Sequence, residues 1–153
     1  MGKAHIVETV EISAPIEQVF ERLIDHEAMS DWPGVSRCRL IREGSPRNGL
    51  GAVREVVGSG LTLHEEVVAY QPPEGYDYKI TKGLPVDHLG RVRLAPVEGG
   101  VRLTWNISMS SRWPFVCGLV GRGLGRGLPK ALAQFKAKTE TAAAEMARRE
   151  VVG

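Results

Sequence analysis

The last third of the chain carries the longest apolar pattern in the sequence. Between Trp113 and Arg149, apolar side chains and one threonine recur at steps of three and four residues, which is the spacing along one face of an α-helix. These positions are Val120, Leu124, Leu128, Leu132, Phe135, Thr139, Ala142 and Met146. The opposite face carries mainly Arg, Lys, Gln and Glu. An apolar stripe of this length must be buried, so the pattern predicts a long C-terminal helix that covers another layer of the protein.

Most of the chain before this helix alternates between apolar and polar positions, which is the period of a β-strand. Each alternating segment is separated from the next by turn residues such as Gly, Pro and Ser. Strands are predicted at 4–12, 36–43, 50–58, 61–70, 75–82, 87–96 and 101–109. Short links between successive strands predict an antiparallel meander, which can curl around one helix.

Two short helices are expected between the first strand and the others. Ser13 is predicted to cap the first helix, with Pro15 near its first helical position and Glu17 in its first turn. A second short helix or turn is predicted at 25–32, and the breaker Pro33-Gly34 ends it.

The bulk composition is typical of one globular domain spanning residues 1–153. The chain is 42% hydrophobic and 25% charged, and a net charge of +2 gives no reason to expect a nucleic-acid partner. No apolar run has the length of a membrane span and the first residues lack the core of a signal peptide, so we expect a cytoplasmic protein without stable membrane insertion. Cys38 and Cys117 show neither metal-ligand nor redox spacing and are expected to be reduced thiols.

The order of the predicted elements resembles that of the helix-grip superfamily (SRPBCC), which includes START lipid-transfer domains, the birch pollen allergen family and the bacterial polyketide cyclase/dehydrase-like proteins. The residues that carry the resemblance are Ile12-Ser13-Ala14-Pro15 through Val19-Phe20, Asp31-Trp32-Pro33, Gly51-Ala52-Val53-Arg54, Glu65-Glu66-Val67 followed by Pro72-Pro73, and Thr104-Trp105. The resemblance implies an α+β fold in which a curved antiparallel sheet of about seven strands wraps around the C-terminal helix. It also implies an elongated apolar cavity between the two layers.

Strand parity indicates which side chains would face such a cavity. Tyr76, Tyr78 and Ile80 share one face of their strand, and Trp105 shares a face with four other large apolar residues of its own strand. Trp105 is the preferred wall residue, because a buried indole N–H needs a partner. Trp32 is expected at the cavity mouth. Any single one of these side chains could instead simply fill a core. From the helix, three residues are expected to close the space: Leu128, Leu132 and Phe135.

Arg54 and Glu65 are the most informative charged pair. Each shares strand parity with apolar neighbours, so both are expected to be buried, and buried charges need partners. A structural cross-strand ion pair and a role in orienting a ligand carbonyl or hydroxyl are both open alternatives. His88 also has inward parity, and near Tyr78 it could transfer a proton or serve as a wall residue.

Glycine recurs between Gly118 and Gly127, but the Lys-Ser/Thr ending of a phosphate-binding loop is missing. The stretch is predicted to be a flexible or tightly packed first part of the long helix, with Pro129 at a kink or at the start of the regular portion. Because glycines cannot plug the space beneath them, this end is expected to admit a ligand. Three basic residues at steps of four, Arg122, Arg126 and Lys130, predict a solvated face or, as a lesser alternative, contact with an anionic membrane.

Three functions follow as hypotheses. The first is binding of a small hydrophobic molecule, such as a lipid, a quinone or a polyketide-like aromatic, by Trp32, Arg54, Glu65, Tyr78, His88, Trp105, Leu128, Leu132 and Phe135. The second, implied by the resemblance, is a polyketide aromatase/cyclase or dehydrase in which Arg54 polarises a carbonyl and Glu65 or His88 accepts a proton. The third is a protein-interaction module. No cofactor and no metal are expected, because the histidines lack ligand spacing, and a homodimer is left open.

Overall fold

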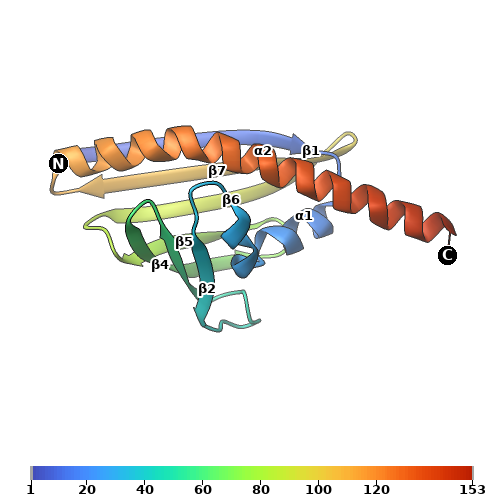
Figure 1. Cartoon of the computed structure of the whole chain (residues 1–153), viewed down its shortest axis with the longest axis horizontal. Helices are drawn as coiled ribbons and strands as arrows, with labels where there is room; N and C mark the ends of the chain where they lie inside the picture. Colours follow the sequence, from blue (N-terminus) through green and yellow to red (C-terminus); the bar gives the residue numbers. More distant parts are fainter. Residues whose placement is uncertain (1, 153) are drawn as a thin grey trace.

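The computed structural model describes residues 2–152 and shows one curved seven-stranded antiparallel sheet with a long helix lying across it (Figure 1). The elements in chain order are β1 (Gly2–Ile12), α1 (Ile16–Leu23), the 3₁₀ helix η1 (His26–Asp31), β2 (Arg37–Arg42), β3 (Val53–Gly58), β4 (Leu61–Gln71), β5 (Gly75–Lys82), β6 (Asp87–Val97), β7 (Gly100–Ser111) and α2 (Pro114–Val152). The predicted element order and the α+β helix-grip class are confirmed.

The strand order in the sheet is β1-β7-β6-β5-β4-β3-β2. Strands β2 to β7 form the predicted meander, whereas β1 pairs with the last strand, from Gly2 opposite Ser111 to Ile12 opposite Val101. The alternation of β7 buries Trp105 and the other apolar residues of its parity beneath the helices. The strand predicted at 50–58 begins only at Val53, because the chain still turns at Gly51, where φ is +87°.

Ser13 does not cap α1, contrary to the prediction. The helix begins at Ile16, its N-cap is Pro15, and no side chain caps it. Ser13 is therefore too far ahead of the first turn for its hydroxyl to reach the free N–H groups there. Its own backbone N–H instead donates to Oε2 of Glu140 at 2.7 Å, which ties the end of β1 to α2.

Helix α2 runs without interruption from Pro114 to Val152. The glycine-rich stretch is therefore helical, and Pro129 lies inside the helix rather than at the start of its regular portion. The side chains that α2 buries are Cys117, Leu128, Ala131, Leu132, Phe135 and Thr139. Beyond Ala143 the helix is exposed, and Figure 1 shows it extending past the sheet toward the C-terminus. Within residues 2–152, no helix is both long enough and apolar enough to cross a membrane.

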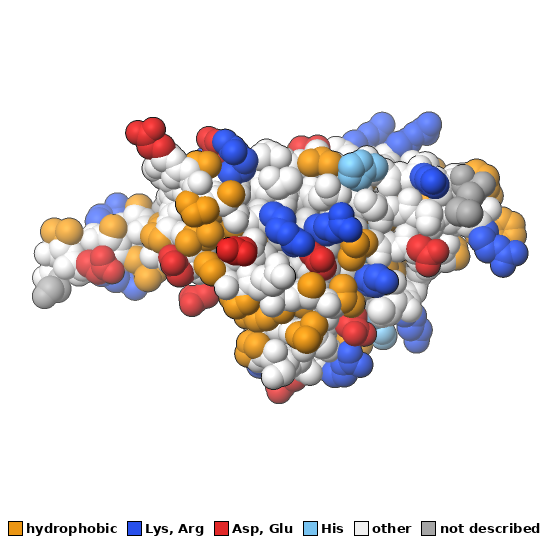
Figure 2. Space-filling view, turned by 180° about the vertical axis from the view of Figure 1, so that it is seen from behind, with side chains coloured by type: hydrophobic (Ala, Val, Ile, Leu, Met, Phe, Trp, Pro, Cys, Tyr) orange, Lys and Arg blue, Asp and Glu red, His pale blue; other side chains and the backbone are white. Residues whose placement is uncertain are grey.

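The core lies between the concave face of the sheet and the helices. It joins Ile12 of β1, Phe20 of α1, Leu103 of β7 and Leu132 of α2, with the thiol of Cys117 buried beside them. Seen from behind, the molecule shows Lys and Arg side chains scattered among acidic ones rather than gathered into one patch of a single sign (Figure 2). This mixed surface agrees with the small net charge.

Candidate functional site

A cavity of about 490 Å³ lies between the concave face of the sheet and the first half of α2. Its walls come from η1 and the loop after it, from β3 to β7, and from one side of α2. The lining residues are Met29, Trp32, Pro33, Gly34, Val35, Arg54, Val56, Gly58, Ser59, Leu61, Leu63, Glu65, Tyr78, Ile80, Leu84, His88, Trp105, Ile107, Leu119, Val120, Gly123, Leu124, Gly127, Leu128 and Ala131. Most are apolar, and the volume lies within the roughly 300–1,000 Å³ of small-molecule sites.

Seven of the nine residues predicted to bind a ligand line this cavity: Trp32, Arg54, Glu65, Tyr78, His88, Trp105 and Leu128. Leu132 and Phe135 do not, so the prediction that they close the cavity is wrong. They are buried on the following turns of α2, in the packed core. The physical reason is that Trp32 packs against both Trp105 and Phe135, with ring centroids 5.5 and 6.1 Å apart, and these rings fill the space in front of Phe135.

Glycines of α2 leave part of this space open. Gly123 and Gly127 line the cavity, and a Cβ atom added to either would meet nothing within 4 Å. Leu119, one turn before Gly123, lines the cavity and is 66% exposed, so it marks the cavity mouth. The gap therefore opens beneath the glycine-rich part of the helix.

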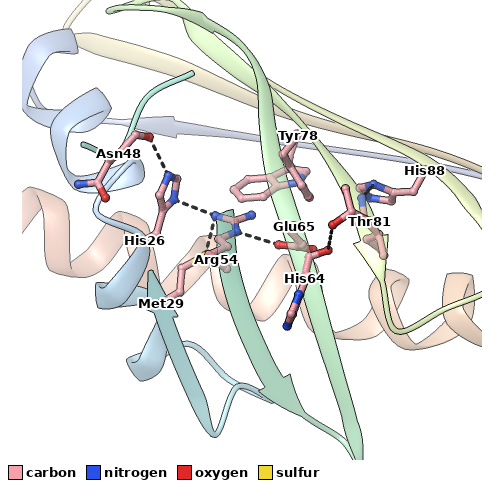
Figure 3. Close-up of polar contacts among 11 residues, drawn as sticks. His26, Met29, Asn48, Arg54, His64, Glu65, Tyr78, Thr81 and His88 are labelled. Atoms are coloured by element: carbon pink, nitrogen blue, oxygen red, sulfur yellow. Dashed lines mark hydrogen bonds and ion pairs between the residues drawn. The ribbon is translucent and has the colours of Figure 1, made fainter. Parts of the chain in front are cut away.

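Arg54 and Glu65 form a buried ion pair. The two residues lie directly opposite each other on β3 and β4, and Arg54 Nε donates to Glu65 Oε1 at 2.8 Å (Figure 3). Their side chains are only 2% and 11% exposed. Burial alone would lower the pKa of Arg54, but the neighbouring carboxylate of Glu65 raises it above its usual value, so the guanidinium stays charged.

His26 is a partner of Arg54 that the sequence analysis missed. Arg54 Nη1 donates to His26 Nδ1 at 3.1 Å and lies 3.0 Å from the sulfur of Met29 (Figure 3). The other ring nitrogen, Nε2, donates to the backbone carbonyl of Asn48 at 2.9 Å. Burial and the charge of Arg54 lower the pKa of His26 to about 3, so the ring is neutral. The contact joins residues 28 positions apart, and no local pattern marks it.

Tyr78 and Trp105 share a buried hydrogen bond. The indole N–H of Trp105 donates to the hydroxyl oxygen of Tyr78 at 2.9 Å, as a buried indole requires. Burial raises the pKa of Tyr78, so the phenol keeps its proton and can donate it. A Cβ atom at Gly90 would overlap the ring of Tyr78, so this position of β6 leaves room for the phenol.

His88 lies on β6 beside Tyr78, with ring centroids 5.2 Å apart. Its Nδ1 accepts the backbone N–H of Ile80 at 3.2 Å, which places the ring proton on Nε2. Burial lowers the pKa of His88, so this ring is also neutral near pH 7. The cavity thus holds one ion pair, Arg54 with Glu65. It also holds two neutral side chains that can donate hydrogen bonds, Tyr78 and His88.

The sequence was compared with protein families and with known proteins. Residues 3–140 match the family model described as polyketide cyclase/dehydrase and lipid transport. No curated protein sequence gives a significant match.

Solved structures share the fold. A START superfamily protein from Mycobacterium smegmatis superposes with a TM-score of 0.66 at 18% identity, covering 93% of this chain and 98% of that one. Protein CV1439 from Chromobacterium violaceum gives 0.69 at 21%, covering 89% and 96%. The di-domain ARO/CYC StfQ from the steffimycin biosynthetic pathway gives 0.69 at 16%, and the match covers 95% of this chain but 52% of StfQ. At these identities the likeness is one of fold.

Proposed function

Because this chain belongs to the polyketide cyclase/dehydrase and lipid transport family, we propose that it binds a small hydrophobic molecule in the cavity between the sheet and α2. The observation that carries the proposal is the cavity itself, with its apolar walls and a few convergent polar groups. A lipid, a quinone or a polyketide-like aromatic belongs to this ligand class. A protein-interaction module would need an exposed groove instead, and a cavity of this size supports ligand binding better.

The proposal gives each lining residue a role. Trp32, Trp105 and Leu128 form apolar walls, and Tyr78 and His88 donate hydrogen bonds to the polar end of the ligand. Arg54 acts indirectly, because its contacts with His26 and Glu65 hold the carboxylate in position.

The test is to plug the cavity and measure binding of a neutral hydrophobic dye, N-phenylnaphthylamine, by its fluorescence. Gly123 lines the cavity and an added Cβ atom would meet nothing within 4 Å, so we expect the side chain of Gly123→Leu to occupy the cavity and to remove most of the dye binding. Gly125→Leu is the matched control, because Gly125 is an exposed position of the same helix that does not line the cavity. Equal dye binding by both variants and the wild type would rule out this cavity as the ligand site.

Catalysis is a second candidate, favoured by the neutral His88 and Tyr78 rings lying side by side in the cavity. A poly-ketone held there could receive hydrogen bonds at its carbonyls from Tyr78 and His88, and could lose a proton to the carboxylate of Glu65. Arg54 is less available to polarise a ligand carbonyl than its inward position on β3 predicts, because Glu65 and His26 already accept hydrogen bonds from it.

A model poly-ketone incubated with the protein should then cyclise, with the product followed by mass spectrometry. Tyr78→Phe and His88→Ala should slow turnover while dye binding persists. Unchanged turnover in both variants would remove these roles, and no turnover by the wild type would leave binding alone.

A further inference from the structure

We infer that the cavity selects uncharged ligands, namely apolar molecules whose polar end is a neutral hydroxyl or carbonyl, and that it discriminates against carboxylates. The inference rests on the proposed ligand binding and goes further by naming the chemical class of the ligand.

The charge balance of the cavity disfavours an anionic ligand. Among the described residues that line the cavity, Arg54 and Glu65 are the charged ones, and their side chains pair at 2.8 Å. The single cation is therefore already used. A ligand carboxylate would have to sit near Glu65 without a cation of its own, and a charge taken out of water needs such a partner.

Neither His26 nor His88 can supply the missing cation. His26 Nδ1 accepts a hydrogen bond from Arg54, so a proton on this nitrogen would face the guanidinium. His88 Nδ1 accepts the N–H of Ile80, so a proton there would face another donor. The basic residues of α2, Arg122 and Arg126, are exposed and do not line the cavity.

The polar groups that remain free in the cavity suit a neutral ligand. Tyr78 accepts from Trp105 and has its own proton left to donate, and His88 carries its proton on Nε2. Glu65 uses Oε1 for Arg54, and within residues 2–152 its Oε2 makes no hydrogen bond. Figure 3 shows Glu65 between Arg54 and His88 in this view, with Tyr78 above. Two donors and one acceptor suit a hydroxyl, which both donates and accepts, or a carbonyl beside a hydroxyl.

The test compares two ligands that share one apolar chain, decanol and decanoate, as competitors of N-phenylnaphthylamine bound to the wild-type protein. At about pH 8, where the acid is ionised, decanol should displace the dye at a concentration at least about tenfold lower than decanoate. As the pH falls toward the pKa of the free acid, decanoate becomes neutral and its apparent affinity should approach that of decanol. The pKa of His26 is about 3, so His26 does not titrate in this range.

Replacing Glu65 by a neutral residue leaves the cavity with a net positive charge. Glu65→Gln removes the carboxylate and leaves the guanidinium of Arg54 unpaired, so decanoate should bind about tenfold more tightly than to the wild type, and the preference for decanol over decanoate should shrink accordingly. The matched control is Arg54→Met/Glu65→Met, which restores neutrality and should again prefer decanol. If Glu65→Gln does not fold, the wild-type comparison decides the matter.

The outcomes separate the two proposals. Wild-type protein that binds decanoate as tightly as decanol at about pH 8 would overturn the neutral-ligand inference and leave hydrophobic binding intact. The same holds if folded Glu65→Gln gains no affinity for decanoate. Failure of both ligands to displace the dye would likewise overturn the inference alone, whereas dye binding unaffected by Gly123→Leu would reject the proposed function, and the inference with it.

Discussion

At the scale of single residues, the side chain of Arg54 holds the site together. Its guanidinium contacts His26 and Met29 of η1, Glu65 of β4 and the ring of Tyr78 of β5, whose centroid lies 4.8 Å from the guanidinium carbon. One cation thus connects three elements that are separate in the sequence. Its replacement affects every one of these contacts.

Arg54→Met should destabilise the protein by about 3–5 kcal/mol, because it leaves the carboxylate of Glu65 buried and unpaired. Arg54→Met/Glu65→Met should recover most of that loss, since two apolar side chains can replace a buried ion pair at little net cost. Urea unfolding of the wild type and both variants measures the difference. A double variant as unstable as the single one would mean that the contacts with His26 and Met29, rather than the ion pair, carry the stability.

His26 should make stability depend on pH. Its pKa is 6.5 when unfolded and about 3 when folded, so the unfolded chain binds the extra proton between these values. The contribution of the neutral His26 ring to the free energy of unfolding is complete above about pH 6.5. It is lost as the pH falls, at up to about 1.4 kcal/mol per pH unit. Because carboxylates and His88 also titrate, the informative quantity is the difference between wild type and His26→Gln. The variant should show a shallower loss between about pH 6 and pH 4 in urea unfolding, and parallel curves would contradict the assignment.

Strand parity predicted that Arg54 and Glu65 are both inward, and it made a cross-strand ion pair one of two open alternatives, because buried charges on neighbouring strands need partners. The same argument correctly placed Tyr78, His88 and Trp105 at the cavity. It could not find His26, whose contact with Arg54 depends on how η1 folds back over β3. The hydrophobic periodicity of a sequence carries no information about a contact between residues so far apart in the chain.

At the scale of elements, one part of α2 borders the cavity and another part packs into the core. As far as Ala131 it borders the cavity, and its glycines leave the space open. From Leu132 to Thr139 it packs into the core. The apolar stripe predicts one continuous buried face and cannot show where the sheet curves away, which is why Leu132 and Phe135 were assigned to the cavity.

Leu132→Ala should cost about 2–5 kcal/mol and Phe135→Ala about 3–5 kcal/mol, because both side chains are almost fully buried in the core. Neither truncation should abolish dye binding, since neither residue lines the cavity. Chemical denaturation and dye titration on the same samples provide both measurements. Complete loss of binding in a folded variant would show that the cavity extends further than the structure indicates.

Gly123→Ala should stabilise the protein by about 0.5–1 kcal/mol, since alanine is the better helix former and its Cβ meets nothing within 4 Å. Gly121→Ala should gain less, because its Cβ would come within 3.3 Å of the Cβ of Ala4. Thermal unfolding of the two variants ranks them. The opposite ranking would show that the glycine-rich part of α2 needs its flexibility to fold.

At the scale of the whole molecule, the cavity is a volume that packing has left unfilled. A ligand that occupies it only in the folded state must therefore raise the stability of the entire domain. The fold as a whole was predictable, because seven alternating segments, short turns and one apolar helical stripe agree on a single architecture. The size of the cavity was not predictable, because it depends on the curvature of the sheet and on rings such as Trp32 that pack between the sheet and α2.

Decanol at about 100 times its dissociation constant should raise the free energy of unfolding by about 2.7 kcal/mol, and Gly123→Leu should show no such gain. Thermal shift measurements at increasing decanol concentration test this. A similar shift in both proteins would indicate binding elsewhere than in the cavity.

The pairing of β1 with β7 also governs how the protein can be made. Each residue of β1 finds its partner between 89 and 109 positions later, from Ile12 with Val101 to Gly2 with Ser111. At about 5–20 residues per second, a ribosome takes roughly 5–20 s to deliver that partner. During this interval β1 has neither of its edges paired, so it is open to pairing with other chains. We therefore expect β1 to depend on shielding by a chaperone until β7 has been synthesised.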